Sequence, residues 1–195
     1  MLVAMPDIRI AQDERADQVL SEHPFALLAG MLLDQQFPME RAFAGPAKIL
    51  DRFGSIDPTE IAAADPDSFR ELCSQPPSIH RFPGSMAERV QALASHVVEQ
   101  YAGDTARLWE EAASGKDLMK RLTSLPGFGK QKAQIFVALL GKQLGVRPPG
   151  WDEVAGDYAS DSAFRSVADV VDPESLQRVR DFKKAAKSKA RQQAT

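Results

Sequence analysis

The chain has 195 residues, of which 44% are hydrophobic and 26% charged, and its formal net charge is −3. This length fits one compact domain or two small lobes, and the slight negative charge argues against indiscriminate nucleic-acid binding. The single cysteine, Cys73, excludes an intramolecular disulfide and any iron–sulfur cluster held by several cysteines of this chain. The three histidines show no metal-ligand spacing, so we expect no metal and no other cofactor.

No segment resembles a signal peptide, and no uncharged apolar run approaches the length of a membrane span. The sequence therefore predicts a cytoplasmic protein, associated with the nucleoid if its source is bacterial. We expect it to act as a monomer and away from membranes.

The charges are segregated along the chain. Residues 116–147 contain seven basic groups and one acid, whereas acidic residues concentrate between positions 57 and 71. The last stretch adds basic side chains without any acid, namely Lys183, Lys184, Lys187, Lys189 and Arg191. This distribution predicts that one face of the protein meets a polyanion. The C-terminal stretch itself either tracks phosphates or forms a frayed, solvated helix end, and both interpretations stay open.

Helical spacing of apolar residues dominates the first half of the chain. His23-Pro24 and Phe37-Pro38 are typical breaks between helices, because proline suits a first turn and disfavours helix in the residue before it. A loop is expected at 75–84, which contains three prolines. The predicted helices in this half are 13–22, 24–34, 39–53, 58–63 and 66–73.

The second half continues the helical pattern. A long amphipathic helix from about Met86 ends near Tyr101, and a strongly apolar helix covers 130–143. Shorter helices are predicted at 105–113, 116–123, 151–158 and 161–170, followed by a terminal one at 173–191. Only Ile8-Arg9-Ile10 could form a strand, so the sequence predicts an all-α fold.

The most informative stretch is Leu-Pro-Gly-Phe-Gly-Lys-Gln-Lys-Ala, residues 125–133. Gly127 and Gly129 allow a tight turn and a close approach to a partner. The first amides of the helix that follows have no acceptor within the helix, and a phosphate oxygen is their natural ligand. Lys130 and Lys132 sit in that first turn, where a cation is unfavourable unless an anion binds. The pattern predicts a DNA-binding helix-hairpin-helix motif at 116–140; the alternative is a plain turn between two helices.

This hairpin resembles that of the helix-hairpin-helix–Gly/Pro/Asp (HhH-GPD) superfamily of DNA glycosylases, which includes endonuclease III and the alkylbase glycosylases. The helix from Pro24 that ends in two glutamines and the stretch 86–122 are similar to that superfamily as well. The resemblance covers about residues 20–147. It implies base excision on double-stranded DNA and a six-helix barrel at 25–140. A second helical lobe would come from 1–24 and 141–195, with the active cleft between the two lobes.

The resemblance also implies roles for individual residues. Gln36, or its neighbour Gln35, would fill the gap left by an extruded nucleotide, although the pair also reads as a polar helix end. Asp152 would be the catalytic carboxylate, with Asp157 as a substitute, yet acids are equally expected in the first turn of a helix. The spacing to Asp152 is longer than in the family, and the family's Thr-His after the aspartate is missing. Trp151 would stack on the extruded base or belong to the core.

Family members that also nick the strand carry a lysine at the position of Gln131. Lys132 is turned by about 100° around the helix axis from there. We therefore expect a monofunctional glycosylase without lyase activity. The alternative function is a catalytically inert DNA-binding protein, such as a lesion sensor or a chromatin-associated factor, and the departure around Asp152 supports it. A helical interaction protein that does not bind DNA is a third interpretation, which the charge segregation disfavours.

Overall fold

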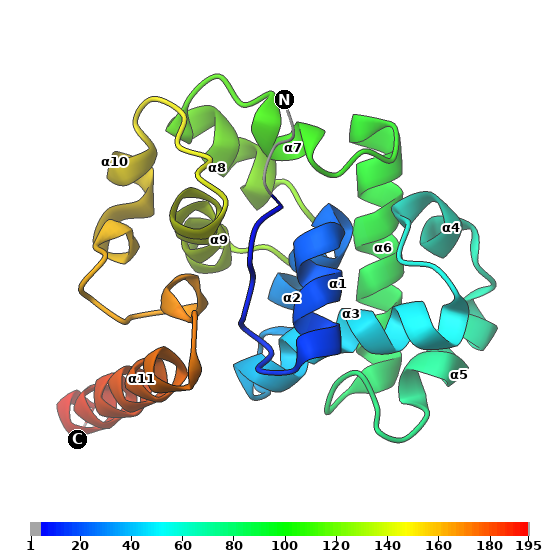
Figure 1. The fold of residues 1–195 in the computed structure, drawn as a ribbon, viewed down its shortest axis with the longest axis horizontal. Helices are drawn as coiled ribbons and strands as arrows, with labels where there is room; N and C mark the ends of the chain where they lie inside the picture. The colour runs from blue at the N-terminus through cyan, green and yellow to red at the C-terminus, as the bar shows by residue number, and fades with distance from the viewer. Residues whose placement is uncertain (1–4, 195) are drawn as a thin grey trace.

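A computed structural model describes residues 5–194 of the chain, and within them it contains helices and no strand. The all-α prediction is therefore confirmed (Figure 1). The α-helices are α1 Glu14–Glu22, α2 Pro24–Leu33, α3 Met39–Phe53, α4 Pro58–Ala63, α5 Pro66–Ser74, α6 Pro83–Tyr101, α7 Arg107–Glu110, α8 Gly115–Thr123, α9 Lys130–Gln143, α10 Trp151–Ala155 and α11 Pro173–Gln193. Two 3-10 helices, η1 Gly156–Ala159 and η2 Val167–Asp169, connect α10 to α11.

Local signals in the sequence explain most helix boundaries. Helices α1, α4, α5, α8 and α11 each begin after an aspartate or serine whose side chain accepts a hydrogen bond from a backbone amide of the first turn. Gly54 ends α3 in the left-handed conformation, with φ of 85°. The predicted bounds of α3, α4 and α9 are confirmed to the residue.

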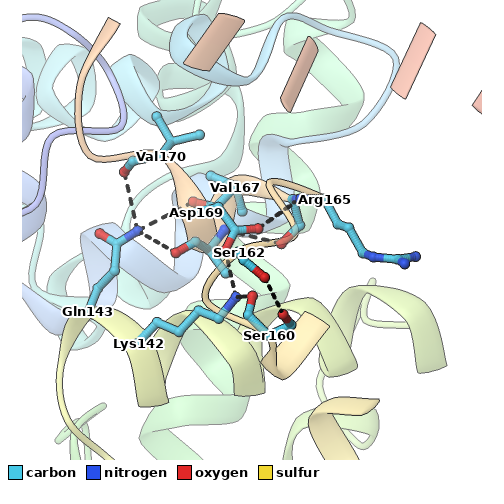
Figure 2. Close-up of polar contacts among 10 residues, drawn as sticks. Lys142, Gln143, Ser160, Ser162, Arg165, Val167, Asp169 and Val170 are labelled. Atoms are coloured by element: carbon cyan, nitrogen blue, oxygen red, sulfur yellow. Dashed lines mark hydrogen bonds and ion pairs between the residues drawn. The ribbon is translucent and has the colours of Figure 1, made fainter. Parts of the chain in front are cut away.

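Ile8-Arg9-Ile10, the only segment that could form a strand, forms none; its backbone runs beside α1, where the Ile8 amide donates to Ser21 Oγ at 3.0 Å. Two predicted helices are wrong. Helix 105–113 shrinks to the single turn of α7. Helix 161–170 is replaced by a loop and η2, because the carboxylate of Asp169 accepts from the amides of Arg165 and Ser166 and fixes a non-helical path (Figure 2).

The ion pair between Lys142 and Asp169 attaches this loop to the end of α9. Lys142 Nζ lies 2.5 Å from Asp169 Oδ1, and both side chains are almost fully buried. Gln143 donates to carbonyls of the same loop, including that of Ala168 at 2.9 Å (Figure 2). The ion pair and these hydrogen bonds hold the segment leading to α11 against α9, while Gln143 Oε1 is buried without a partner among the described residues.

The core centres on α2, whose residues from Phe25 to Leu33 are all buried. Helices α1 and α3 pack on α2, α4 packs against α6, and α5 packs against both α6 and α3 (Figure 1). Within residues 5–194, no helix is long and apolar enough to cross a membrane.

Helix α10 packs closely against the second half of α9. A Cβ added at Gly141 would lie 2.1 Å from the ring of Trp151, so only glycine permits this approach. The Trp151 indole donates to the Val137 carbonyl at 2.7 Å, and the Arg147 guanidinium stacks 4.4 Å from the ring centroid. Trp151 therefore anchors α10 to α9.

We predict that Gly141→Ala lowers the free energy of unfolding by about 1–3 kcal/mol, the typical cost of forcing atoms into a packed core. Urea denaturation followed by circular dichroism measures the effect. Gly84→Ala is the matched control, because a Cβ there meets nothing closer than 3.7 Å. Equal stabilities of the two variants would contradict the described packing of Trp151.

Candidate nucleic-acid interface

Helices α8 and α9 form a hairpin around a tight turn. The Phe128 amide donates to the Leu125 carbonyl at 3.2 Å, which closes a four-residue turn with Pro126 at its second position. Gly127 has φ of 81°, which the third position of a type II turn requires. Phe128 is buried and packs edge-on against Phe136, with ring centroids 6.2 Å apart. Phe128 therefore anchors the turn in the core, while Gly127 and Gly129 are exposed to solvent.

The amides at the start of α9 have no acceptor. Among the described residues, no hydrogen bond is formed by the backbone N–H groups of residues 129–132, and Gly129 provides no side-chain cap. Gly127, Gly129 and Lys130 are exposed, and nothing lies within 4 Å of a Cβ added at Gly129. In contrast to α8, which Ser114 caps, α9 begins with open donors and the positive end of its dipole. This corner has the chemistry of an anion site.

Lys132 points away from this corner and into the protein. Its ammonium donates to the carbonyls of Met31 at 2.8 Å, Leu32 at 3.0 Å and Asp34 at 3.4 Å. These carbonyls belong to the end of α2, where the helix dipole favours a cation. Burial lowers the pKa of Lys132 from 10.5 to about 8, although the nearby Asp34 carboxylate opposes the decrease. The DNA-binding role of Lys132 remains a prediction, and its observed contacts join α9 to α2.

The contacts of Lys132 with the end of α2 bring Gln35 and Gln36 beside the hairpin. The two glutamines differ in how many hydrogen bonds hold them. Gln35 donates to the Leu32 carbonyl at 3.1 Å, accepts from Arg89 at 3.4 Å, and its own carbonyl lies 2.9 Å from His80 Nε2. Gln36 is exposed, makes no side-chain hydrogen bond among the described residues, and has φ of 50°. Left-handed backbone at a non-glycine residue is uncommon and tends to occur at functional sites. Of the pair, Gln36 is the one free to reach a ligand.

Sequence reasoning missed Asp34, which precedes the glutamines. Burial raises the pKa of its carboxyl group, and the ammonium groups of Lys183 and Lys132 oppose that increase. The side chain is half-buried, and its carboxylate has no hydrogen-bond partner among residues 5–194. The nearby Glu40 also contributes a buried Oε2 without a partner. A partly buried acid between two lysines is a pattern that active sites often use.

Asp152 and Trp151 lie elsewhere. Asp152 is exposed in the first turn of α10, and no hydrogen bond or ion pair of its side chain is formed within the described part of the chain. Trp151 sits over Val137 and Gly141, which are five and nine residues beyond Lys132 and so about 8 to 14 Å farther along α9. The ring is 95% buried and its indole N–H is already bonded. Their catalytic and base-stacking roles remain predictions, as does the cleft between two lobes.

Other residues around the glutamines were also not found from sequence. His80 is buried; its Nε2 donates to the Gln35 carbonyl and its Nδ1 accepts from the Phe82 amide at 3.0 Å. Burial lowers the pKa of His80, which favours the neutral ring that these two bonds require. Arg89 enters from α6 and Lys183 from α11. These three residues are at least 44 positions away from the glutamines in the chain, so no local pattern could indicate them.

The chain was compared with known proteins. A family model described as the HhH-GPD superfamily of base excision DNA repair proteins matches residues 29–195. The match spans most of the chain and includes the hairpin and both glutamines, so the protein belongs to the HhH-GPD superfamily of base excision DNA repair proteins. Searches of curated proteins and of solved structures gave no match.

The buried ammonium of Lys132 predicts a specific dependence of stability on pH. Its pKa in the folded chain is about 8, below the 10.5 of the unfolded chain. Between these values the unfolded chain binds more protons, so this group makes the free energy of unfolding rise with pH in that window. In Lys132→Met this contribution is lost.

Urea titrations from pH 7 to pH 10.5 would measure this effect as the difference between wild type and variant. Lys130→Met is the control, since the exposed Lys130 ammonium has no partner among the described residues. A wild-type pH profile unchanged by Lys132→Met would contradict the assignment of this buried ammonium.

Proposed function

We propose that this protein is a monofunctional DNA N-glycosylase that removes a damaged or mismatched base from duplex DNA. The observation that carries the proposal is the pair of features at one corner: open amides at the start of α9 and the free Gln36 beside them. Membership in a base excision repair family supports the same reaction class. We further propose that it acts as a monomer in the cytoplasm.

In this proposal the hairpin holds a DNA strand by its backbone. A phosphate oxygen accepts from the amides that follow Phe128, and the exposed Lys130 adds charge at the same point. Such contacts position the protein on DNA without reading its sequence. Gln36 then occupies the space that an extruded nucleotide leaves in the duplex. Gln35 supports it through the bonds to Arg89 and His80.

Hydrolysis needs a carboxylate near the sugar of the extruded nucleotide. The C1′–N bond breaks, its electron pair leaves with the base, and the base takes up a proton. Water forms the new bond to C1′ and gives its proton to the carboxylate. Two residues compete for this role. Asp152 is the residue that the family pattern suggests, whereas Asp34 is supported by its partial burial and its position directly before the glutamines. We favour Asp34.

The proposal includes no strand cleavage. A lyase of this superfamily uses an amine that attacks the sugar, and Gln131 at that position has none. Gln131 donates instead to Tyr158 Oη at 3.2 Å. The neighbouring ammonium of Lys132 is engaged by the carbonyls of α2. Neither side chain therefore offers a free nucleophile.

The first prediction concerns binding. Gly129→Val should reduce affinity for all duplexes, damaged or intact, by tenfold or more, because a branched side chain covers the amides that a phosphate must reach. The fold should tolerate it, since φ of −78° suits any residue and the space around Gly129 is open. Fluorescence anisotropy measures affinity, and thermal unfolding checks the fold. Unchanged affinity in a folded variant would remove the hairpin from the interface.

The second prediction concerns chemistry. On duplexes with alkylated, deaminated, oxidised or mismatched bases, followed by alkali, the wild-type protein should create abasic sites on at least one substrate. Asp34→Asn should reduce the single-turnover rate by at least about 100-fold at unchanged affinity, whereas Asp152→Asn should have little effect.

The reverse pattern would restore Asp152 as the catalytic carboxylate. Binding without release of any base would favour the inert DNA-binding alternative. A nick formed without alkali would contradict the absence of lyase activity.

A further inference from the structure

The last helix leaves the protein body after its first two turns. Ser175, Leu176 and Val179 of α11 are buried, whereas every described residue from Arg180 onward is exposed. In Figure 1, α11 extends outward to the C-terminus on the side opposite α4 and α5. Burial against the body therefore does not explain the run of basic residues in this outer half.

The outer half of α11 presents a stripe of positive charge, which we call the α11 stripe: Lys183, Lys184, Lys187 and Arg191. At about 100° per residue, these four positions fall within about 100° of one another around the helix axis. None of them forms an ion pair within the described part of the chain. Lys189 does not belong to the stripe, because it lies about 180° around the helix axis from the middle of the stripe.

The stripe continues the interface described above. Arg180, one turn earlier on the same side of α11, contacts Glu40 at the start of α3. Lys183 lies close enough to act electrostatically on both Asp34 and Lys132. The stripe therefore starts near Glu40 and near Asp34, the residue before the glutamines, and runs outward from there.

The geometry of the stripe suits a nucleic-acid backbone. From Lys183 to Arg191 the helix rises about 12 Å, a distance over which one strand of a duplex presents about three or four phosphates. A membrane surface fits less well, because a helix that lies in a membrane needs a broad apolar face opposite its charges. Phe182 is the one large apolar side chain after Arg180, and the Arg165 guanidinium covers it 5.2 Å from its ring centroid.

We propose that the α11 stripe is a second DNA contact, which grips the phosphates of the duplex flanking the extruded nucleotide. This proposal rests on the proposed DNA-binding function and adds a surface to it. The contact is electrostatic and independent of base sequence, so it should increase affinity for damaged and intact duplexes alike. Each phosphate that the stripe neutralises should add about 0.9 to the slope of log affinity against log salt concentration.

The test compares two single substitutions in the same helix. Lys187→Gln removes a charge from the stripe, and Lys189→Gln removes the same charge from the opposite side. With the full-length protein and an intact fluorescent duplex, anisotropy is measured between about 50 and 200 mM salt. We expect Lys187→Gln to lower the salt slope by about 0.9 and Lys189→Gln to leave it unchanged. Combining Lys184→Gln, Lys187→Gln and Arg191→Gln should lower it by about 2.7.

Each other outcome overturns the proposal. Equal effects of Lys187→Gln and Lys189→Gln would mean that the tail acts as an unstructured polycation. No change in either variant would mean that α11 does not touch DNA. Vesicles rich in phosphatidylserine provide the membrane arm, and vesicle binding lost in the triple variant while duplex affinity stays constant would assign the stripe to membranes. Failure of the wild-type protein to bind DNA at all would instead refute the proposed function.

Discussion

The interface depends on one interaction between two helix ends. The ammonium of Lys132, in the first turn of α9, donates to three carbonyls at the end of α2. These carbonyls form the negative end of the α2 dipole in a largely buried place, and the Lys132 ammonium supplies the positive charge that balances it. The same bonds fix the start of α9, with its open amides, beside the turn that carries Gln36. A contact inside the protein thus positions the groups that we propose meet DNA.

The C-terminal end of α2 and the N-terminal end of α9 have opposite polarity. The two lysines in the first turn of α9 therefore lie in different surroundings. The ammonium of Lys132 binds the carbonyls of α2 and is therefore not available on the surface, whereas Lys130 is exposed. The open amides of α9 have the chemistry of an anion site, and Arg89 and Lys183 add positive charge near the Lys132 ammonium. The net charge of −3 therefore does not oppose DNA binding, because the positive potential is local. Burial raises the pKa of Asp34, and the charges of Lys183 and Lys132 partly offset this increase.

The sequence predicts those parts of the fold that depend on short-range chemistry. The proline, glycine and aspartate residues that begin or end a helix lie next to its ends in the chain. The bounds of α3, α4 and α9 could therefore be predicted to the residue. The turn at Gly127 and the open amides after Phe128 also follow from local pattern. The prediction of a helix at 161–170 was wrong because Asp169 bonds to Lys142 and to nearby amides. These contacts outweigh the helical spacing of the apolar residues in this segment.

Within the candidate site, what could not be predicted depends on long-range contacts. Lys132 and Lys130 look alike in sequence, and only the position of α2, some 100 residues earlier, separates their roles. The packing of Trp151 depends on the absence of a side chain at Gly141, ten residues earlier on another helix, so the sequence around Trp151 does not indicate it. Asp34 reads as a residue at a helix end, and its surroundings come from α9 and α11. Side chains that converge from distant segments have no spacing to reveal them.

We propose that the amides at the start of α9 bind the backbone of a DNA strand. Amide chemical shifts of the ¹⁵N-labelled protein, followed during titration with an intact duplex, report on this contact residue by residue. We expect saturable downfield shifts of the N–H signals of Gly129, Lys130 and Gln131, with no comparable change at the start of α8, which Ser114 caps. If those three signals stay in place while the duplex binds elsewhere on the protein, the start of α9 is not the DNA contact.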